Sequence, residues 1–265
     1  MAVLLSTLQV VRDAQHLVGG LNAFGSAYKK QMRPGGDSTA KKVMHTKTIA
    51  AECDRIVTSM LHERGDYYVI DHIIYASPDL GRGIQKFATD YGIEPEPGGP
   101  HPGFGTRNAF IGLGAQGYLE ILAIDDEEPV PPSKRFLRLE RRSPSRFIAW
   151  CARADRPLQE TAELARAAGY DLGNVVTMSR KRPDGSLMSW HLTPFAKRDG
   201  VLPLYIDWGG TPNPATLLRP SLTLVSLTLV HPNPKRIQAI IDALGENEVA
   251  VERGSKRALL VNLSR

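Results

Sequence analysis

The chain has 265 residues, of which 42% are hydrophobic and 23% are charged, as is typical of a globular protein with a sizeable core. Its formal net charge of +5 comes from residues 1–50, and the rest of the chain is electrically neutral, which gives no support for nucleic-acid binding. No run approaches the ~20 apolar residues of a membrane span, and two widely separated cysteines, Cys53 and Cys151, favour a reducing, cytoplasmic location.

Residues 1–66 differ in composition from the rest of the chain. Residues 29–42 are polar and contain Gly and Pro, which predicts a linker or disorder. In residues 48–64 the apolar side chains recur at the spacing of one amphipathic helix. We therefore expect a less ordered N-terminal extension over 1–66, with one helix, followed by a structured domain over 67–265.

The structured part begins with a strand, a helix and two further strands. The pattern predicts a strand over 67–76, a helix over 80–92 capped by Ser77 or Asp79, and strands over 107–114 and 117–124. The stretch "GGPHPGFGTRN", residues 98–108, lacks the third glycine of a dinucleotide fingerprint and the Gly-Lys-Ser/Thr of a phosphate loop. We expect it to be a substrate-facing loop that joins the helix to the sheet, with a purely structural turn as the alternative.

The same order of elements then recurs twice. A second strand and helix lie in 146–173, followed by a hairpin in 174–195 and a closing strand in 201–210. A shorter third version runs from 220 to 265. The repetition predicts an α+β fold of βαβββ modules, at about 67–128, 145–210 and 220–265, whose curved mixed sheets surround a cleft.

Three stretches of this domain carry a resemblance to a known family. "IDHIIYASPDL", "GGPHPGFGTRNAFIGLGAQGYLEILA" and "GVLPLYIDWG" resemble the glyoxalase-like members of the vicinal oxygen chelate superfamily. The resemblance covers residues 67–265 and implies paired βαβββ modules around one site. The superfamily includes isomerases, lyases, dioxygenases and binding proteins, so the fold alone does not define the activity.

The resemblance also implies a divalent metal ion held by side chains of both modules. It places His72 and Glu120 as ligands from the first module, and a carboxylate in an apolar strand does need a cation, a proton or a partner. In the second module, aligning the strand ends places Ile148 at the position of His72 and Asp207 at that of Glu120. His191 is a further candidate ligand, so we expect His72, Glu120 and either His191 or Asp207, unless these histidines are structural.

The remaining candidates are expected to bind the substrate. His101 in the glycine-rich stretch is expected to act as an acid, a base or a hydrogen-bond donor. Arg107 is expected to pair with a substrate carboxylate, and Asn108 to brace the loop beside the substrate. Trp150 and Trp208 are expected to line an apolar pocket, although aromatic residues of strands also serve as core.

Two functions of different classes follow. The first is a metal-dependent lyase or isomerase that acts on a small oxygenated substrate, with Glu120, Asp207 or His101 moving the proton; a dioxygenase is less favoured. The second is a metal-free protein that binds or sequesters a small molecule, which Ile148 at a ligand position favours. The expected partner is a small molecule, without nucleic acid or membrane, and a homodimer is a further expectation.

Overall fold

The computed structural model describes residues 70–265, except 115–116, 141–143 and 182–184. The expected N-terminal extension over 1–66, with its helix at 48–64, lies outside the described residues. The chain divides into two units, Met1–Gly65 and Asp66–Arg265, and every element below belongs to the second. None of the helices in the described ranges is long and apolar enough to cross a membrane.

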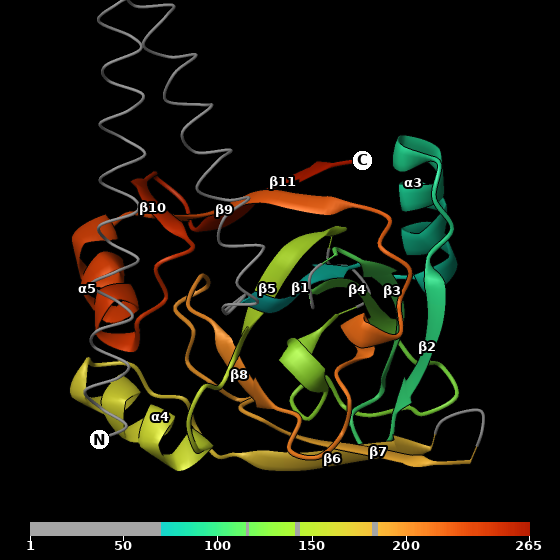
Figure 1. The fold of residues 1–265 in the computed structure, drawn as a ribbon, viewed down its shortest axis with the longest axis horizontal. Helices are drawn as coiled ribbons and strands as arrows, with labels where there is room; N and C mark the ends of the chain where they lie inside the picture. The colour runs from blue at the N-terminus through green and yellow to red at the C-terminus, as the bar shows by residue number, and fades with distance from the viewer. Residues whose placement is uncertain (1–69, 115–116, 141–143, 182–184) are drawn as a thin grey trace, which may run out of the picture. The chain divides into compact units, whose positions relative to one another are not determined.

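The predicted repetition of modules is confirmed (Figure 1). The first module contains β1 (Ile70–Ala76), α3 (Leu80–Tyr91), β2 (Glu96–His101), β3 (Thr106–Gly112) and β4 (Tyr118–Ile124). The second contains β5 (Arg146–Arg153), α4 (Leu158–Ala167), β6 (Val176–Lys181), β7 (Leu187–Leu192) and β8 (Leu204–Asp207). The third contains β9 (Thr223–His231), α5 (Pro234–Leu244), β10 (Ala250–Arg253) and β11 (Ala258–Ser264). Two 3-10 turns, Phe136–Arg138 and Pro214–Thr216, lie between the modules.

The first two modules form one curved eight-stranded sheet. Its order is β2-β3-β4-β1-β5-β8-β7-β6, and the antiparallel pair of β1 and β5 joins the two modules. In each module the first strand runs parallel to the last, β1 with β4 and β5 with β8. The sheet curves so far that its edge strands β2 and β6 contact each other, which nearly closes it into a barrel (Figure 1). The inner face of this sheet therefore surrounds an interior.

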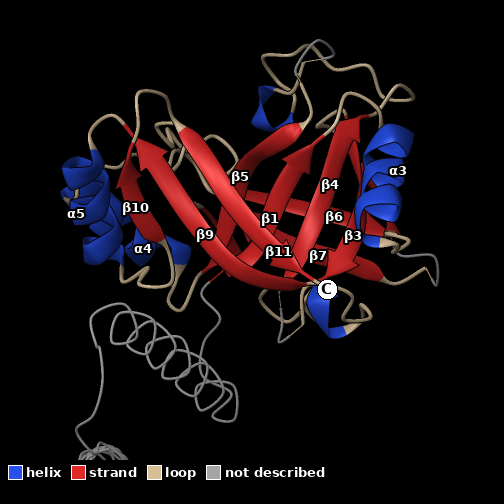
Figure 2. Ribbon diagram, turned by 90° about the horizontal axis from the view of Figure 1, so that it is seen from above, coloured by secondary structure: helices blue, strands red, loops and turns tan. Residues whose placement is uncertain are grey.

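The third module covers the outer face of the large sheet. Its three strands form a separate sheet in the order β10-β9-β11, which crosses β1 and β5 in Figure 2. One buried core unites Ile73 and Trp150 of the large sheet with Leu229 and Ile240 of the third module. Burial of apolar surface stabilises this contact by about 25 cal/mol per Å². Because the third module covers the outer face, the inner face of the large sheet is available for a site.

Local signals explain the element boundaries, with one correction. Asp79 caps α3 by accepting a hydrogen bond from the backbone N–H of Arg82 at 2.8 Å, and Gly92 ends the helix in the left-handed conformation. The stretch 98–108, however, is not a loop, because Glu96–His101 form β2 and only residues 102–105 make the turn into β3. Prolines are tolerated in β2 because it is an edge strand of the sheet.

Candidate active site

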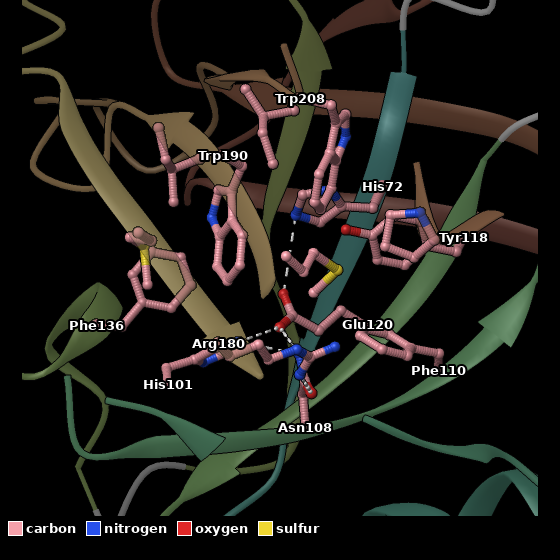
Figure 3. A pocket seen from close by; sticks show the side chains of 15 residues that line it. His72, His101, Asn108, Phe110, Tyr118, Glu120, Phe136, Arg180, Trp190 and Trp208 are labelled. Carbon is pink, nitrogen blue, oxygen red and sulfur yellow. Dashed lines mark hydrogen bonds and ion pairs between the residues drawn. The ribbon is translucent and has the colours of Figure 1, made fainter. Parts of the chain in front are cut away.

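A pocket lies on the inner face of the curved sheet and has an empty volume of about 390 Å³ (Figure 3). Its polar lining comes mostly from the first module: His72, His101, Asn108 and Glu120, with Arg180 from the second. Its apolar lining includes Phe110, Phe136, Met178, Met188, Trp190 and Trp208. The site combines apolar walls with a few polar groups, as small-molecule sites do.

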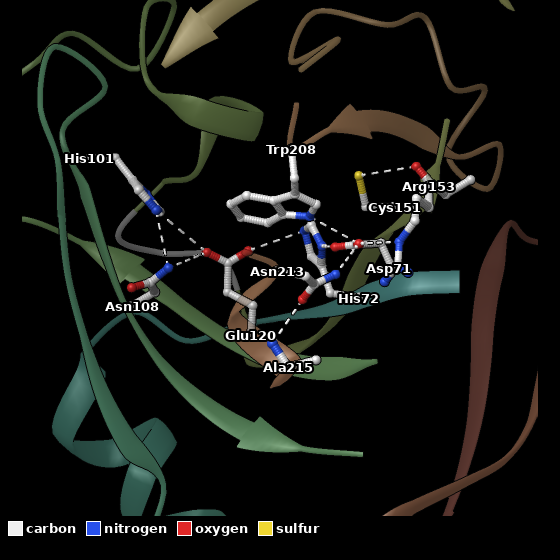
Figure 4. A network of polar contacts seen from close by, with 11 residues as sticks. Asp71, His72, His101, Asn108, Glu120, Cys151, Arg153, Trp208, Asn213 and Ala215 are labelled. Atoms are coloured by element: carbon white, nitrogen blue, oxygen red, sulfur yellow. Dashed lines mark hydrogen bonds and ion pairs between the residues drawn. The ribbon is translucent and has the colours of Figure 1, made fainter. Parts of the chain in front are cut away.

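A buried carboxylate beneath the pocket fixes the orientation of His72 (Figure 4). Asp71 has no exposed surface and accepts a hydrogen bond from Nδ1 of His72 at 2.8 Å. Its second oxygen accepts from Trp208 Nε1 at 3.0 Å, from Asn213 Nδ2 at 2.7 Å and from Arg153 Nε at 3.2 Å. A carboxylate oxygen accepts this hydrogen bond, so Nδ1 of His72 donates it and Nε2 is left to face the pocket.

Nε2 of His72 faces a second carboxylate that lines the same pocket. His72 Nε2 lies 3.8 Å from Glu120 Oε2, and both side chains are almost fully buried. The ring of Tyr118 stacks on His72 with centroids 4.7 Å apart, and burial raises the pKa of this phenol well above its usual value. Tyr118 is therefore a protonated packing partner that holds the imidazole plane. The two atoms are too close for a substrate atom to lie between them, so a substrate in the pocket would meet both groups side by side.

Asn108 orders the other side of Glu120. Its Nδ2 donates to Glu120 Oε1 at 2.6 Å and to His101 Nε2 at 3.1 Å, while Nδ1 of His101 donates to Thr106 Oγ1 at 2.9 Å. Burial lowers the pKa of the His101 imidazole, and this desolvation outweighs the attraction of Glu120. His101 lines the pocket as expected, but its ring is neutral and both of its nitrogens are engaged. It acts here as a positioning residue for Asn108.

The glycines of "GGPHPGFGTRN" make room for this asparagine. A Cβ on Gly98 would lie 1.9 Å from Asn108 Oδ1, and the backbone N–H of Gly99 donates to the same oxygen at 3.1 Å. Gly103 and Gly105 have φ values of +83° and +58°, which the turn between β2 and β3 requires. The stretch therefore supports the site through its backbone, because its glycines make room for the side chain of Asn108.

The structure brings a different arginine to the pocket from the one expected. Arg107 lies on the other face of β3, with its side chain 40% exposed and Nη1 3.9 Å from Asp125. Arg180 of β6 instead lines the pocket and donates from Nη1 to Asn108 Oδ1 at 3.2 Å. Its guanidinium carbon lies 5.4 Å from the centre of the Phe110 ring. The reason is the alternation of strand residues, which directs Asn108 inward and its neighbour Arg107 outward.

His191 and Asp207 do not join His72 and Glu120, which corrects the expected metal set. Trp190 on β7 and Ile206 on β8 face the pocket, so the next residue on each strand faces away. His191 and Asp207 are partners across the two strands, and both line a separate depression near the start of α4. Alignment of the modules matched Asp207 with Glu120, but the side chain of Asp207 lies on the other face of the sheet.

The two expected pocket tryptophans also separate. Trp208 lines the pocket, next to Trp190, with ring centroids 5.7 Å apart. Trp150 is fully buried in the core on the opposite face, where its Nε1 donates to the carbonyl of Val201 at 2.8 Å. Trp150 is therefore a core residue and does not contact a ligand in the pocket.

The donors in the pocket do not fit the divalent metal ion that the resemblance implies. Asn108 already donates to His101 Nε2 and to one oxygen of Glu120, so the side chains left to bind a metal ion are His72 and Glu120. Across the described ranges, no group of three or more His, Cys, Asp or Glu side chains could hold a metal ion. Two protein ligands are fewer than the three or four of known zinc sites.

Among the residues of the second module that the structure describes, none supplies a replacement ligand. The core that β5 and β8 form toward the pocket contains Ala149, Cys151, Leu204 and Ile206. Only the thiol of Cys151 is a donor, and burial raises its pKa well above the usual value, which keeps it protonated. The first module therefore provides the polar half of the site, and the second provides mostly its apolar half.

Two important residues escaped the sequence analysis. Asp71 precedes His72, and regular alternation would place it on the opposite face, but the pairing of β1 with β5 shifts register between Ile70 and His72. An Asp-His pair in an apolar strand is the signal that could have identified it. Arg180 lies in a hairpin with several charged residues, and nothing in that local pattern distinguishes it.

Comparisons with known proteins agree with this architecture. The family model described as glyoxalase-like domain matches residues 70–245. A hypothetical protein from Staphylococcus aureus has a similar structure, with a TM-score of 0.54 and 14% identity over 72% of this chain and 90% of that one. The methylmalonyl-CoA epimerase from Mycobacterium tuberculosis matches with a TM-score of only 0.33 and 19% identity, over 56% of this chain and 91% of its own.

No curated protein sequence matches the chain. The structural likeness to the S. aureus protein, at 14% identity, shows the fold alone. The family model spans more than half of the chain, and the repeated modules agree with the resemblance seen in the sequence. The chain belongs to the glyoxalase-like domain family of the vicinal oxygen chelate superfamily.

Proposed function

We propose that this protein is an isomerase or lyase that moves a proton on a small oxygenated organic substrate. One observation carries the proposal: His72 Nε2 and Glu120 Oε2 face each other at 3.8 Å inside a buried pocket. Two adjacent groups that can each take or return a proton are what an isomerase or lyase needs to move a proton between neighbouring atoms of a substrate. The lyase or isomerase class remains as the sequence suggested.

The surrounding residues support distinct roles for the two groups. Glu120 is held by Asn108 at one oxygen, so its other oxygen is directed toward the substrate and serves as a base. His72 takes or returns the proton at a neighbouring position through Nε2, and Asp71 stabilises the imidazolium that forms. The aromatic walls exclude water, which strengthens the electrostatic interactions in the pocket. No step passes through a metal ion, because two donors alone are free for one.

A proton-exchange experiment tests this proposal. The full-length protein is incubated in D₂O with a panel of 2-oxo carboxylic acids and α-hydroxy ketones, and loss of the carbon-bound proton is followed by NMR. We expect exchange that falls roughly 10²–10⁴-fold in Glu120→Gln and in His72→Gln, the usual contribution of a general base. Glu163→Gln, an exposed carboxylate on α4, is the matched control and keeps the wild-type rate.

Two results would count against the proposal. Exchange at the wild-type rate in Glu120→Gln would show that this carboxylate does not move the proton. Exchange that disappears on treatment with a chelator and returns with Zn²⁺, Mn²⁺ or Fe²⁺ would restore the metal-dependent mechanism that the resemblance implies. Metal content by plasma mass spectrometry, in wild type and His72→Ala, separates these cases.

A second candidate is a metal-free binding protein that uses the same pocket. The apolar half of the lining favours it, because Met178, Met188, Trp190 and Trp208 offer large contact surfaces without reactive groups. Under this alternative no compound of the panel exchanges its proton, while ligand affinity is kept in Glu120→Gln. Quenching of the fluorescence of the pocket tryptophans measures that affinity directly.

A further inference from the structure

We infer that the substrate of this pocket is a small carboxylic acid, and that Arg180 binds its carboxylate next to the reacting carbon. This inference rests on the proposed function, since it uses the same pocket and names the class of its substrate. Arg180 lies on β6 of the second module, at the edge where the barrel nearly closes. Its side chain reaches into a site built mainly by the first module (Figure 3).

The charged residues that line the pocket support this inference. Arg180 is the single Arg or Lys among the described residues that line the pocket, and Glu120 is the single Asp or Glu. An anionic substrate that approached Glu120 alone would be repelled, and like charges disfavour each other strongly in a buried site. A guanidinium beside it offsets this repulsion and offers a planar set of donors that matches a carboxylate.

The hydrogen bonds of Asn108 also support it, because they place Arg180 next to Glu120. One amide group links the two charged residues, because Asn108 accepts from Arg180 Nη1 at 3.2 Å and donates to Glu120 Oε1 at 2.6 Å. The guanidinium and the base are therefore neighbours. A carboxylate bound to Arg180 has its own α or β carbon within reach of Glu120 and His72. This spacing favours acids whose reacting carbon lies one or two bonds from the carboxylate, such as 2-oxo or 2-substituted acids.

The position of Arg180 is also well defined. Its guanidinium lies over the ring of Phe110, which limits its movement, as cation–π contacts with Arg do. Asn108 does not depend on it for orientation, since the backbone N–H of Gly99 donates to the same amide oxygen at 3.1 Å. Removal of the arginine should therefore change ligand binding without disordering Glu120.

The remaining walls define the rest of the ligand. Trp190 and Trp208 lie side by side in the pocket, and Phe136 borders it with Met178 and Met188. These side chains offer an apolar surface opposite the polar cluster of the first module. The ligand class that fits is a small acid with an apolar or aromatic substituent.

A matched pair of ligands tests the inference in the full-length protein. The probes are 3-phenylpropanoate and its neutral amide 3-phenylpropanamide, titrated against the tryptophan fluorescence of the pocket. We expect the acid to bind the wild type at least about tenfold more tightly, since hydrogen bonds to charged groups contribute that much or more. In Arg180→Met the acid loses roughly tenfold to a hundredfold in affinity, and the amide less than about threefold.

Two further variants serve as controls. Lys181→Gln, the next residue on β6 and exposed, removes the same charge outside the pocket and changes neither affinity. Arg180→Lys keeps the charge, retains part of the preference for the acid, and replaces Arg180→Met if that variant fails to fold in a thermal unfolding control. Equal affinity of the wild type for both ligands, an equal loss of both in Arg180→Met, or no binding of either ligand would overturn the inference.

The two proposals fail in different ways. Proton exchange that requires Glu120 but shows no preference for acids would refute only the role of Arg180. Preference for the acid in both the wild type and Glu120→Gln, without proton exchange in the wild type, would refute only the proton-transfer function.

Discussion

Replacement of Asp71 by Asn tests the proposed network most directly. This carboxylate is fully buried and accepts hydrogen bonds from four side chains, including His72 and Arg153. Asn keeps the shape but has one acceptor oxygen and one NH₂ group. If the oxygen faces His72, the NH₂ group faces the three donors on the other side. If the amide turns over, His72 loses its acceptor.

The magnitude follows from the burial of these groups. Removal of one partner of a buried, hydrogen-bonded charge pair costs about 3–5 kcal/mol, because the other groups stay buried without compensation. We therefore expect the free energy of unfolding of Asp71→Asn to fall by about that amount, a large part of the 5–15 kcal/mol typical of a domain. Where the protein stays folded, a turned amide donates to His72 Nδ1 and moves the ring proton to Nε2. Proton exchange should then fall about 10²-fold or more.

The assay is urea unfolding followed by tryptophan fluorescence, combined with NMR proton exchange below the unfolding transition. The control is Asp171→Asn, an exposed carboxylate paired with Lys197 at 2.8 Å, for which we expect the unfolding midpoint of the wild type because exposed ion pairs contribute little. A free energy of unfolding for Asp71→Asn within about 1 kcal/mol of the wild type would refute the reasoning, because a satisfied buried carboxylate cannot be lost at that cost.

Three further predictions concern other parts of the fold. In Gly98→Ala the new Cβ would lie 1.9 Å from Asn108 Oδ1 and would displace this side chain. Because Asn108 holds Glu120, proton exchange should fall at least about tenfold. Burial raises the pKa of Glu246 from 4.5 to about 8. Between these two pH values the native state binds more protons than the unfolded state. The free energy of unfolding therefore falls as pH rises from 4.5 to 8, by up to about 4–5 kcal/mol. Urea unfolding at several pH values should show that Glu246→Gln lacks this fall. His191→Ala and Asp207→Ala should leave ligand affinity in the pocket unchanged within about threefold, because both residues face outward.

Each of these predictions has a contradicting outcome. Wild-type exchange in Gly98→Ala would mean that Asn108 can move without loss of the site. Parallel pH dependence of stability in the wild type and Glu246→Gln would assign the effect to other groups. A large loss of affinity or of bound metal in His191→Ala would return this residue to the site.

Local and repeated features of the fold were predictable from the sequence. Capping and termination of α3 by Asp79 and Gly92 depend on residues within one helix, so a short window of sequence contains the information. The recurrence of strand, helix and strands is likewise a pattern of one chain with itself, and it predicted the modular α+β fold. Glu120 stood out because a carboxylate in an apolar strand needs a partner, and His72 stood out through the resemblance to the family.

Which side chains line the pocket depends on tertiary contacts that no local sequence pattern predicts. Arg180 lies 72 residues from Asn108 in the chain, and the near closure of the barrel at β2 and β6 brings them together. Arg107, beside Asn108 in sequence, faces the opposite side of the strand. The register irregularity in β1 that accompanies the contact of Asp71 with His72 also arises from pairing with another strand. The sequence by itself therefore determined the elements, the repeat and two polar groups, because these depend on neighbouring residues. Only the tertiary structure decided which face of each strand lines the pocket, because strand curvature, register and closure are set by distant partners.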